Sequence, residues 1–271
     1  MVIIKEIYCK NILVKSGISD SGYSLNPYTG CEHNCQYCYA VFMKKFTNHK
    51  ERWGEFVDVK INAKDVLLNQ IKKIKDEKIF IGTACDPYQP LEEKYKITRS
   101  CLEVLKDYKN EISILTKSDL ILREIDILRR IENIEVGFSI TIFNENYKKI
   151  FEPNSTNVIK RFEALKLLSE KGIKTWVFVA PIIPSFSDDE NNLKNIFEYS
   201  IKSGVSEILF DSLNLYPSVF VNIKNIYKRY FPERLKEFYY YQNNKKIYLH
   251  NLKEKIKIIE ENFKIHFDFC F

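Results

Sequence analysis

Three of the seven cysteines lie close together in residues 26–39, with a spacing suited to metal chemistry. Cys31, Cys35 and Cys38 follow the pattern C-x3-C-x2-C. Cysteine thiolates bind iron–sulfur clusters, and three of them can each take one iron of a [4Fe–4S] cluster, whose full complement is four. The fourth iron then keeps an open position, as catalytic metal sites do and closed structural sites do not. The spacing therefore predicts a [4Fe–4S] cluster with one open iron.

Three other roles stay open for these cysteines. A zinc ion would use the three thiolates with His33 as the fourth ligand, although structural zinc sites usually take ligands from two separated pairs. A closed ferredoxin-type cluster would need a fourth cysteine, and none of the remaining ones has ferredoxin spacing: Cys9, Cys85, Cys101 and Cys270. The third alternative is a set of buried thiols that bind no metal.

Short apolar strands alternate with amphipathic helices along the chain as far as residue 215. We expect strands at residues 56–61, 78–85, 111–116, 135–142, 175–183 and 207–213. We expect helices at residues 39–47, 63–75, 99–108, 119–131, 158–171 and 188–203, and a last extended segment at 263–270. This alternation is typical of a parallel sheet with helical crossovers. It gives about six βα units, fewer than the eight of a closed barrel.

The fold class predicted from this pattern is α/β, a partial (β/α)6 barrel with a C-terminal helical extension. We expect an N-terminal extension at residues 1–25, the barrel at 26–215, and a mostly helical extension at 216–271 packed on the barrel. Polar residues follow the expected strands, in segments 82–90, 116–119, 138–141, 180–184 and 210–214. Because ligands gather at the C-terminal ends of barrel strands, these segments predict one site at that rim.

The bulk composition is that of a globular protein. The chain has 271 residues, of which 45% are hydrophobic and 29% charged. No apolar run approaches the ~20 residues of a membrane-spanning helix, and residues 1–8 lack the features of a signal peptide. The odd number of cysteines, three of them in one loop, argues against a secreted disulfide framework. We therefore expect a cytoplasmic protein without a membrane partner.

The cysteine spacing resembles that of the radical S-adenosylmethionine (radical SAM) superfamily. The strand-end motifs are similar to those of its spore photoproduct lyase-like branch: Thr-Lys at 116–117, Phe-Ser-Ile-Thr at 138–141, and Phe-Glu-Pro at 151–153 with Arg161. The resemblance covers about residues 25–215 and implies the same partial barrel. It also implies that S-adenosyl-L-methionine (SAM) binds the open iron and is cleaved to methionine and a 5′-deoxyadenosyl radical. The electron would come from a flavodoxin or a ferredoxin.

The resemblance also implies roles for several residues. Tyr37 and Tyr39 match two tyrosines that flank the third cluster cysteine. Lys117 matches a lysine that contacts SAM. Ser139 matches the serine of the family's Phe-Ser-Ile-Asn motif, whose asparagine is replaced here by Thr141. We expect Tyr39 to act in catalysis and the other four to bind the cofactor.

Cys85 and Asp86, at the end of the strand expected at residues 78–85, are two further candidates. Spore photoproduct lyase carries a hydrogen-donor cysteine three residues before an aspartate, and counting back from Asp86 places Thr83 there. Cys85 lies two residues later, on the same face of a continuing strand. It is either a catalytic hydrogen donor or a buried strand cysteine. Asp86 and Glu152 would accept hydrogen bonds from SAM, or else cap a helix or pair with Arg161.

The positive charge is concentrated near the C-terminus. The chain has a formal net charge of +6, and residues 218–262 hold ten lysines and arginines against five glutamates. The same segment holds Tyr227, Tyr230, Tyr239, Tyr240, Tyr241 and Tyr248. Basic residues among aromatic ones can bind nucleic acid, whereas solvated surface helices are the alternative.

The function expected from these features is radical abstraction of hydrogen from an unidentified substrate, with nucleic acid as one candidate. Thr83, in place of the donor cysteine, favours a substrate other than the thymine dimer that spore photoproduct lyase repairs. The alternatives are a DNA repair lyase of that type and a non-catalytic zinc or iron–sulfur module that binds nucleic acid.

Overall fold

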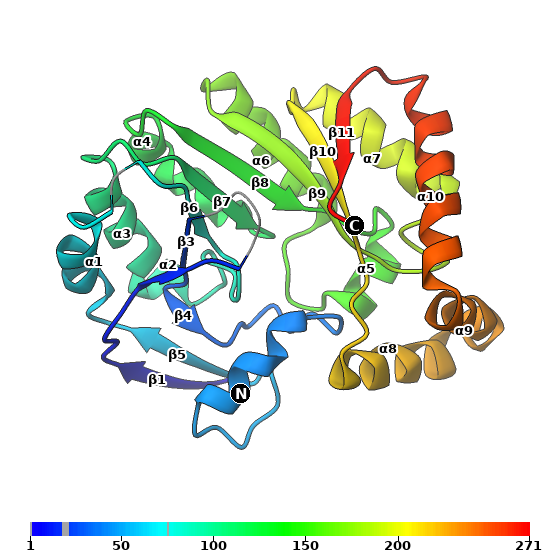
Figure 1. The fold of residues 1–271 in the computed structure, drawn as a ribbon, viewed down its shortest axis with the longest axis horizontal. Coiled ribbons are helices and arrows are strands. Elements are labelled where there is room, and N and C mark those ends of the chain that lie inside the picture. Colours follow the sequence, from blue (N-terminus) through cyan, green and yellow to red (C-terminus); the bar gives the residue numbers. More distant parts are fainter. Residues whose placement is uncertain (1, 18–21, 75) are drawn as a thin grey trace.

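An eight-stranded, mostly parallel sheet forms the centre of the molecule. The computed structural model describes residues 2–17, 22–74 and 76–271. The strands lie in the order β2 (Leu13–Lys15), β3 (Tyr23–Leu25), β6 (Ile79–Ile81), β7 (Ile112–Thr116), β8 (Ile134–Ser139), β9 (Lys174–Ile182), β10 (Glu207–Ser212) and β11 (His266–Phe269). Each neighbouring pair is parallel except β2 and β3. The fold is therefore the expected α/β partial barrel (Figure 1).

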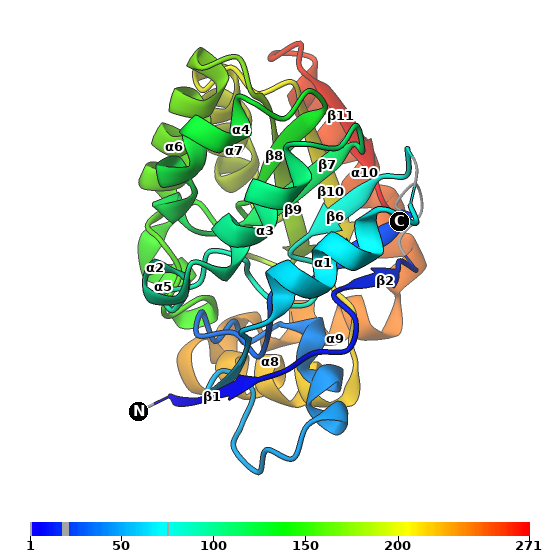
Figure 2. The same ribbon diagram turned by 90° about the vertical axis from the view of Figure 1, so that its left-hand side faces the viewer.

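Helices cover one face of this sheet (Figure 2). The 3₁₀-helix η1 (Tyr39–Phe46) lies away from this face, at one end of the molecule. The covering helices are α1 (Ala63–Ile71), α2 (Glu92–Tyr95), α3 (Ile97–Leu105), α4 (Ile125–Leu128), α5 (Glu145–Phe151), α6 (Val158–Glu170) and α7 (Glu190–Lys202), with the 3₁₀-helix η2 (Asp119–Glu124). Alternate strand residues point toward them, and these are apolar and buried: Ile112, Ile114, Val136, Phe138, Val177, Val179, Ile208 and Phe210. Each contributes about 1.5–3 kcal/mol by leaving water.

The strand expected at residues 56–61 exists, but its predicted place in the barrel was wrong. It is β5 (Phe56–Lys60), which pairs with β1 (Ile3–Ile7) and β4 (Tyr28–Thr29) in a separate three-stranded sheet. The barrel strand that precedes the cysteine loop is β3. With three residues, β3 is too short to show the period-two pattern from which strands are predicted.

The helix expected at residues 119–131 is divided into η2 and α4. The Ser118 hydroxyl accepts a hydrogen bond from the Leu120 N–H at 3.3 Å and so begins a tighter turn. Asn62 precedes α1 but does not cap it with its side chain. Its amide instead pairs with both backbone groups of Cys9, at 2.8 and 2.9 Å.

The C-terminal residues form the expected helices and then return to the sheet. They are α8 (Pro217–Tyr230), the 3₁₀-helix η3 (Pro232–Arg234), α9 (Leu235–Asn243) and α10 (Lys245–Glu260), followed by β11 beside β10. Pro232 interrupts the helical run, and α8 and α9 lie at one end of the barrel (Figure 1). Within the described ranges, no helix has the length and apolar character needed to cross a membrane.

Candidate active site

The cysteine loop lies between β4 and η1 and is held by side chains from two later segments. The Gln89 amide accepts from the Glu32 N–H at 2.9 Å and donates to the Gly30 carbonyl at 3.3 Å. On the other side, the Asn154 amide donates to the Glu32 carbonyl at 2.8 Å. Gln89 follows β6 and Asn154 follows α5, after β8. The loop is therefore placed at the C-terminal ends of the parallel strands, where the sequence predicted the site.

The three thiols of this loop suit a cluster with cysteine ligands. All seven cysteines, each within the described residues, are free, and Cys31 is buried while Cys35 and Cys38 are half-buried. Burial raises the pKa of Cys35 to about 12, and the Lys117 cation opposes that rise. Binding of iron would displace the thiol protons, and the nearby cation favours the resulting thiolate. The donor set fits a [4Fe–4S] cluster.

The geometry fits a zinc site less well. A zinc site needs its ligands to converge on one ion, whereas the cysteines of a [4Fe–4S] cluster bind different irons. In the parts of the chain that the structure describes, no three His, Cys, Asp or Glu side chains converge in that way. His33, the fourth ligand of the zinc alternative, faces Asp86 instead, with Nδ1 3.2 Å from Oδ2.

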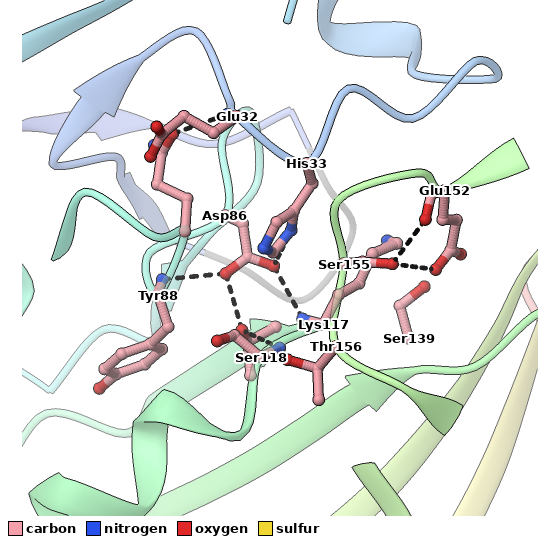
Figure 3. A network of polar contacts seen from close by, with 12 residues as sticks. Glu32, His33, Asp86, Tyr88, Lys117, Ser118, Ser139, Glu152, Ser155 and Thr156 are labelled. Atoms are coloured by element: carbon pink, nitrogen blue, oxygen red, sulfur yellow. Dashed lines mark hydrogen bonds and ion pairs between the residues drawn. The ribbon is translucent and has the colours of Figure 1, made fainter. Parts of the chain in front are cut away.

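Asp86 ties three segments of the rim together (Figure 3). Its carboxylate accepts hydrogen bonds from the Thr116 hydroxyl and the Lys117 N–H, both at 2.7 Å, and from the Tyr88 N–H at 2.9 Å. Burial alone raises the pKa of Asp86, but the His33 ring and these donors outweigh it and bring the pKa down to about 2. Asp86 is therefore ionised and joins the loop after β6 to the end of β7 and to the cysteine loop.

The Lys117 side chain is a half-buried cation between the cysteine loop and a second acidic group. Burial lowers its pKa, but the Cys35 and Glu152 anions raise the pKa more, so the net shift is upward. Its ammonium lies 5.8 Å from the centre of the Tyr37 ring. Lys117 therefore supplies a fixed positive charge beside Cys35.

A buried ion pair between Arg161 and Glu152 also holds the cysteine loop in place. Arg161 donates to the Glu152 carboxylate at 2.6 Å and to the Ser139 carbonyl at 2.7 Å. Tyr37 donates its hydroxyl to the other Glu152 oxygen. Ser155 donates to the Glu152 carboxylate at 2.9 Å (Figure 3). Burial raises the pKa of Glu152, but Arg161 and Lys117 bring it down to about 2. The pairing of Glu152 with Arg161 was one of the two roles that the sequence left open.

Ser139 and Thr141 lie at the end of β8 and beyond it, both buried at 1% exposure. Their hydroxyls donate to the same carbonyl, that of Ala180 in β9, at 3.3 and 2.6 Å. Each hydroxyl oxygen can still accept a hydrogen bond. The structure therefore brings both residues to the rim, with their donors directed at the neighbouring strand.

Asn26, a residue that sequence reasoning missed, holds the segment 83–85, which contains Cys85 and is contacted by Tyr39. Asn26 accepts from the Ala84 N–H and donates to the Thr83 hydroxyl, both at 2.8 Å, and its amide oxygen lies 3.8 Å from the Cys85 sulfur. Tyr39 donates its hydroxyl to the Thr83 carbonyl. Burial raises the pKa of Cys85 to about 12, so the thiol keeps its hydrogen. Asn26 follows β3, and reading β3 as a barrel strand would have identified it.

Replacing Gly30 with alanine is expected to destabilise the protein more than replacing Gly172. Both glycines have positive φ, +95° and +79°, and a strained residue there costs about 1–3 kcal/mol. A Cβ at Gly30 would also lie 2.2 Å from the Phe56 carbonyl oxygen, whereas Gly172 has open space. Urea unfolding of the two variants measures the difference, and iron content after reconstitution reports loop damage. Equal destabilisation and equal iron content would contradict the prediction.

The sequence of this chain is similar to that of a known protein family and of several other proteins. The model of the family described as "Radical SAM superfamily" matches residues 25–195. An uncharacterized protein of Methanocaldococcus jannaschii is 36% identical over 260 residues, which are 95% of this chain and 93% of that protein. A protein of Pseudomonas phage M6, "Radical SAM Nalpha-GlyT isomerase", is 22% identical over 215 residues, covering 78% of this chain and 44% of its own length.

Solved structures of spore photoproduct lyase share this fold. The lyase complexed with dinucleoside spore photoproduct has a TM-score of 0.71 and 16% identity, covering 99% of this chain and 82% of that one. A mutant with bound AdoMet and dinucleoside spore photoproduct has a TM-score of 0.71 and 15% identity, over 100% of this chain and 82% of that one. At these identities the similarity concerns the fold.

Proposed function

The chain belongs to the radical SAM superfamily of enzymes, and from that premise we propose that Cys31, Cys35 and Cys38 bind its [4Fe–4S] cluster. When bound, the reduced cluster and SAM supply a 5′-deoxyadenosyl radical, which takes a hydrogen atom from the substrate. The observation that carries this proposal is the set of three free thiols in one loop at the C-terminal rim, with the Lys117 cation beside Cys35. Membership of an enzyme superfamily argues against the non-catalytic module.

The residues around the loop have distinct proposed roles toward SAM. Lys117 holds a charge that suits the SAM carboxylate. Tyr37 donates its hydroxyl to Glu152, and its ring lies next to the Lys117 ammonium and helps to position that ammonium. Ser139 and Thr141 can accept hydrogen bonds from SAM, since their donors are already engaged. Asp86 is proposed to accept a hydrogen bond from SAM, and its own hydrogen bond from the Lys117 N–H also positions Lys117.

Cys85 and Tyr39 are the proposed hydrogen donors of the reaction. The Cys85 thiol would give its hydrogen atom to a carbon radical of the substrate and become a sulfur radical. The Tyr39 phenol would then return a hydrogen atom to that sulfur, and the phenoxyl radical left behind would be restored to the phenol by an electron from the proposed flavodoxin or ferredoxin and a proton from water. Both side chains meet the same segment after β6.

Replacing Cys85 with alanine is expected to leave SAM cleavage largely unchanged while the product is lost or altered, because the substrate radical then has no Cys85 hydrogen atom to take. Mass spectrometry of 5′-deoxyadenosine and of the substrate, run in parallel, checks this. Cys101→Ala, a buried thiol in α3, is the matched control. β6 ends at Ile81, so the strand expected at residues 78–85 is shorter than predicted and Cys85 lies in the loop after it. An unchanged product from Cys85→Ala would show that Cys85 is a buried structural cysteine of that loop.

Nucleic acid is the proposed substrate class. Two findings support it: the structural neighbours bind a dinucleoside, and residues 218–262 carry excess positive charge. In that segment Tyr230 and Tyr240 are exposed, whereas Tyr227 and Tyr241 are buried and the Tyr248 hydroxyl donates to the half-buried Asp188. The exposed tyrosines offer faces for bases.

The test of this substrate class is whether nucleic acid stimulates SAM cleavage. Anaerobically reconstituted protein is given SAM, dithionite and either DNA or RNA, and 5′-deoxyadenosine is measured against a no-nucleic-acid control. We expect stimulation that weakens steeply with salt. Absence of both binding and stimulation at low salt would remove nucleic acid from the proposal and leave SAM cleavage in place.

A repair lyase of the spore photoproduct type is the second candidate, favoured by the dinucleoside complexes of the structural neighbours. Release of thymine from a cross-linked dimer would establish it. In either case the cluster needs a reductant, and we propose a flavodoxin or a ferredoxin as the electron donor.

A further inference from the structure

The 3₁₀-helix η1 carries an exposed row of aromatic and basic side chains directly after Cys38. A 3₁₀-helix has three residues per turn, so residues three apart lie above one another. Tyr39, Phe42 and Lys45 form such a row. The rings of Tyr39 and Phe42 are stacked with centroids 6.4 Å apart and planes 27° from parallel. The Lys45 ammonium lies 5.9 Å from the Phe42 ring and 4.9 Å from that of Phe46.

These rings are unusually exposed for their size. Phe42 is 46% exposed, Phe46 69% and Tyr39 43%, and within η1, all of which the structure describes, Ala40 is the buried residue. Aromatic side chains normally gain most from burial. A contiguous group of exposed rings marks an interaction surface. The η1 row, defined as Tyr39, Phe42, Lys45 and Phe46, is such a surface.

The η1 row begins at the candidate active site and leads outward. Tyr39 follows the last cysteine of the loop, and its hydroxyl bonds the Thr83 carbonyl beside Cys85. Figures 1 and 2 both show η1, in blue, at the same end of the molecule as α8. A molecule that reacts at the rim would therefore extend onto η1.

The positive charge around the η1 row favours a polyanion as the molecule that binds there. Residues 39–50 contain Lys44, Lys45 and Lys50 and no acidic residue. Exposed rings next to lysines are the arrangement by which proteins hold single-stranded nucleic acid, with bases on the rings and phosphates on the cations. An acidic electron-donor protein would match the charge, but it would not account for aligned ring faces.

We propose that the η1 row binds the single-stranded segment next to the reacting nucleotide. This inference rests on the proposed nucleic-acid substrate. Bases of the flanking strand stack on Phe42 and Phe46, and Lys45 neutralises a phosphate. The reacting nucleotide is thereby held at the rim, close to the cysteine loop.

The experiment uses reconstituted holoenzyme and a fluorescein-labelled oligothymidylate of about 12 nucleotides, within the usual site sizes. Phe42→Ala and Phe46→Ala should each weaken binding about 5- to 150-fold, the range found for loss of base stacking. Lys45→Ala should reduce the slope of log K against log salt by about 0.7. Phe42→Tyr and Phe46→Tyr, which keep the ring, should bind as the wild type does.

Tyr8→Ala is the matched control, because Tyr8 is 78% exposed and follows the end of β1 that is paired with Lys60. β5 is the strand that follows η1 in the chain. Its first residue, Phe56, lies at the opposite end of the β1–β5 pair from Tyr8. Binding by Tyr8→Ala should equal that of the wild type. Iron content of every variant confirms that the cluster is loaded.

Two outcomes would overturn the inference while sparing the proposed substrate class. In the first, the wild type binds the oligonucleotide and the alanine variants bind it equally well. In the second, those variants lose cleavage driven by flavodoxin but keep cleavage driven by dithionite, which would make η1 the electron-donor surface. If the wild type itself fails to bind at low salt, the proposed substrate class falls together with the inference.

Discussion

Replacing any one of Cys31, Cys35 and Cys38 with alanine is expected to abolish SAM cleavage. Removing a residue that only supports a metal ligand typically costs 10–100-fold, so loss of a ligand itself should cost at least about 100-fold. Each variant should also hold less iron and sulfide after anaerobic reconstitution. Formation of 5′-deoxyadenosine, followed by mass spectrometry, measures the loss.

Cys101→Ala is the control for this series. Burial raises the pKa of Cys101 to about 12, as it does that of Cys35, so both thiols are protonated in the metal-free protein. Cys101 lies in α3, packed in the core. We expect this variant to keep its cluster and its activity. Retained cleavage in all three loop variants would contradict the assignment of the cluster.

Arg161→Met is expected to lower the free energy of unfolding by about 3–5 kcal/mol, the usual result of leaving a buried charge unpaired. Arg161 is 1% exposed, and Glu152, its partner, is 2% exposed. Without the guanidinium, the hydrogen bonds left to the Glu152 carboxylate among the described residues come from the Tyr37 and Ser155 hydroxyls, and the Lys117 cation nearby makes no hydrogen bond to it. Urea unfolding of the apo variant under anaerobic conditions measures the change.

Lys166→Ala offers a comparison on the same helix. Lys166 pairs with Glu170 at 3.9 Å, and both side chains are more than half exposed, so its loss should cost at most about 1 kcal/mol. The double variant Arg161→Met with Glu152→Gln should be more stable than Arg161→Met alone, because the unpaired charge is gone. A cost for Arg161→Met no larger than that for Lys166→Ala would refute this account of the buried pair.

The sequence predicted the barrel well because its strands and helices have strong, different periods. Ile112–Thr116 and Glu207–Ser212 are short strands close to their expected bounds, and the helix Val158–Glu170 stops just before Gly172, whose positive φ suits a helix end. It failed for β3, which has three residues and no period to detect. It misplaced β5, because a period reveals that a strand exists and not which sheet it joins.

The candidate site could likewise be predicted from the sequence only in part. The cysteine spacing is local, so it could be recognised along the chain. The positions of Asn26 and Gln89 depend on contacts with residues 57–59 positions away, which no local pattern encodes. The tyrosines of residues 218–262 show the same limit, because packing buries Tyr227 and Tyr241 and leaves Tyr230 and Tyr240 exposed.

The most direct test is the formation of 5′-deoxyadenosine by the wild-type protein. The protein is reconstituted anaerobically with iron and sulfide, then given SAM and dithionite, with and without an oligonucleotide. We expect 5′-deoxyadenosine that depends on SAM, on the reductant and on an intact set of Cys31, Cys35 and Cys38. A fully assembled cluster that binds SAM and yields none under either condition would contradict the proposed function.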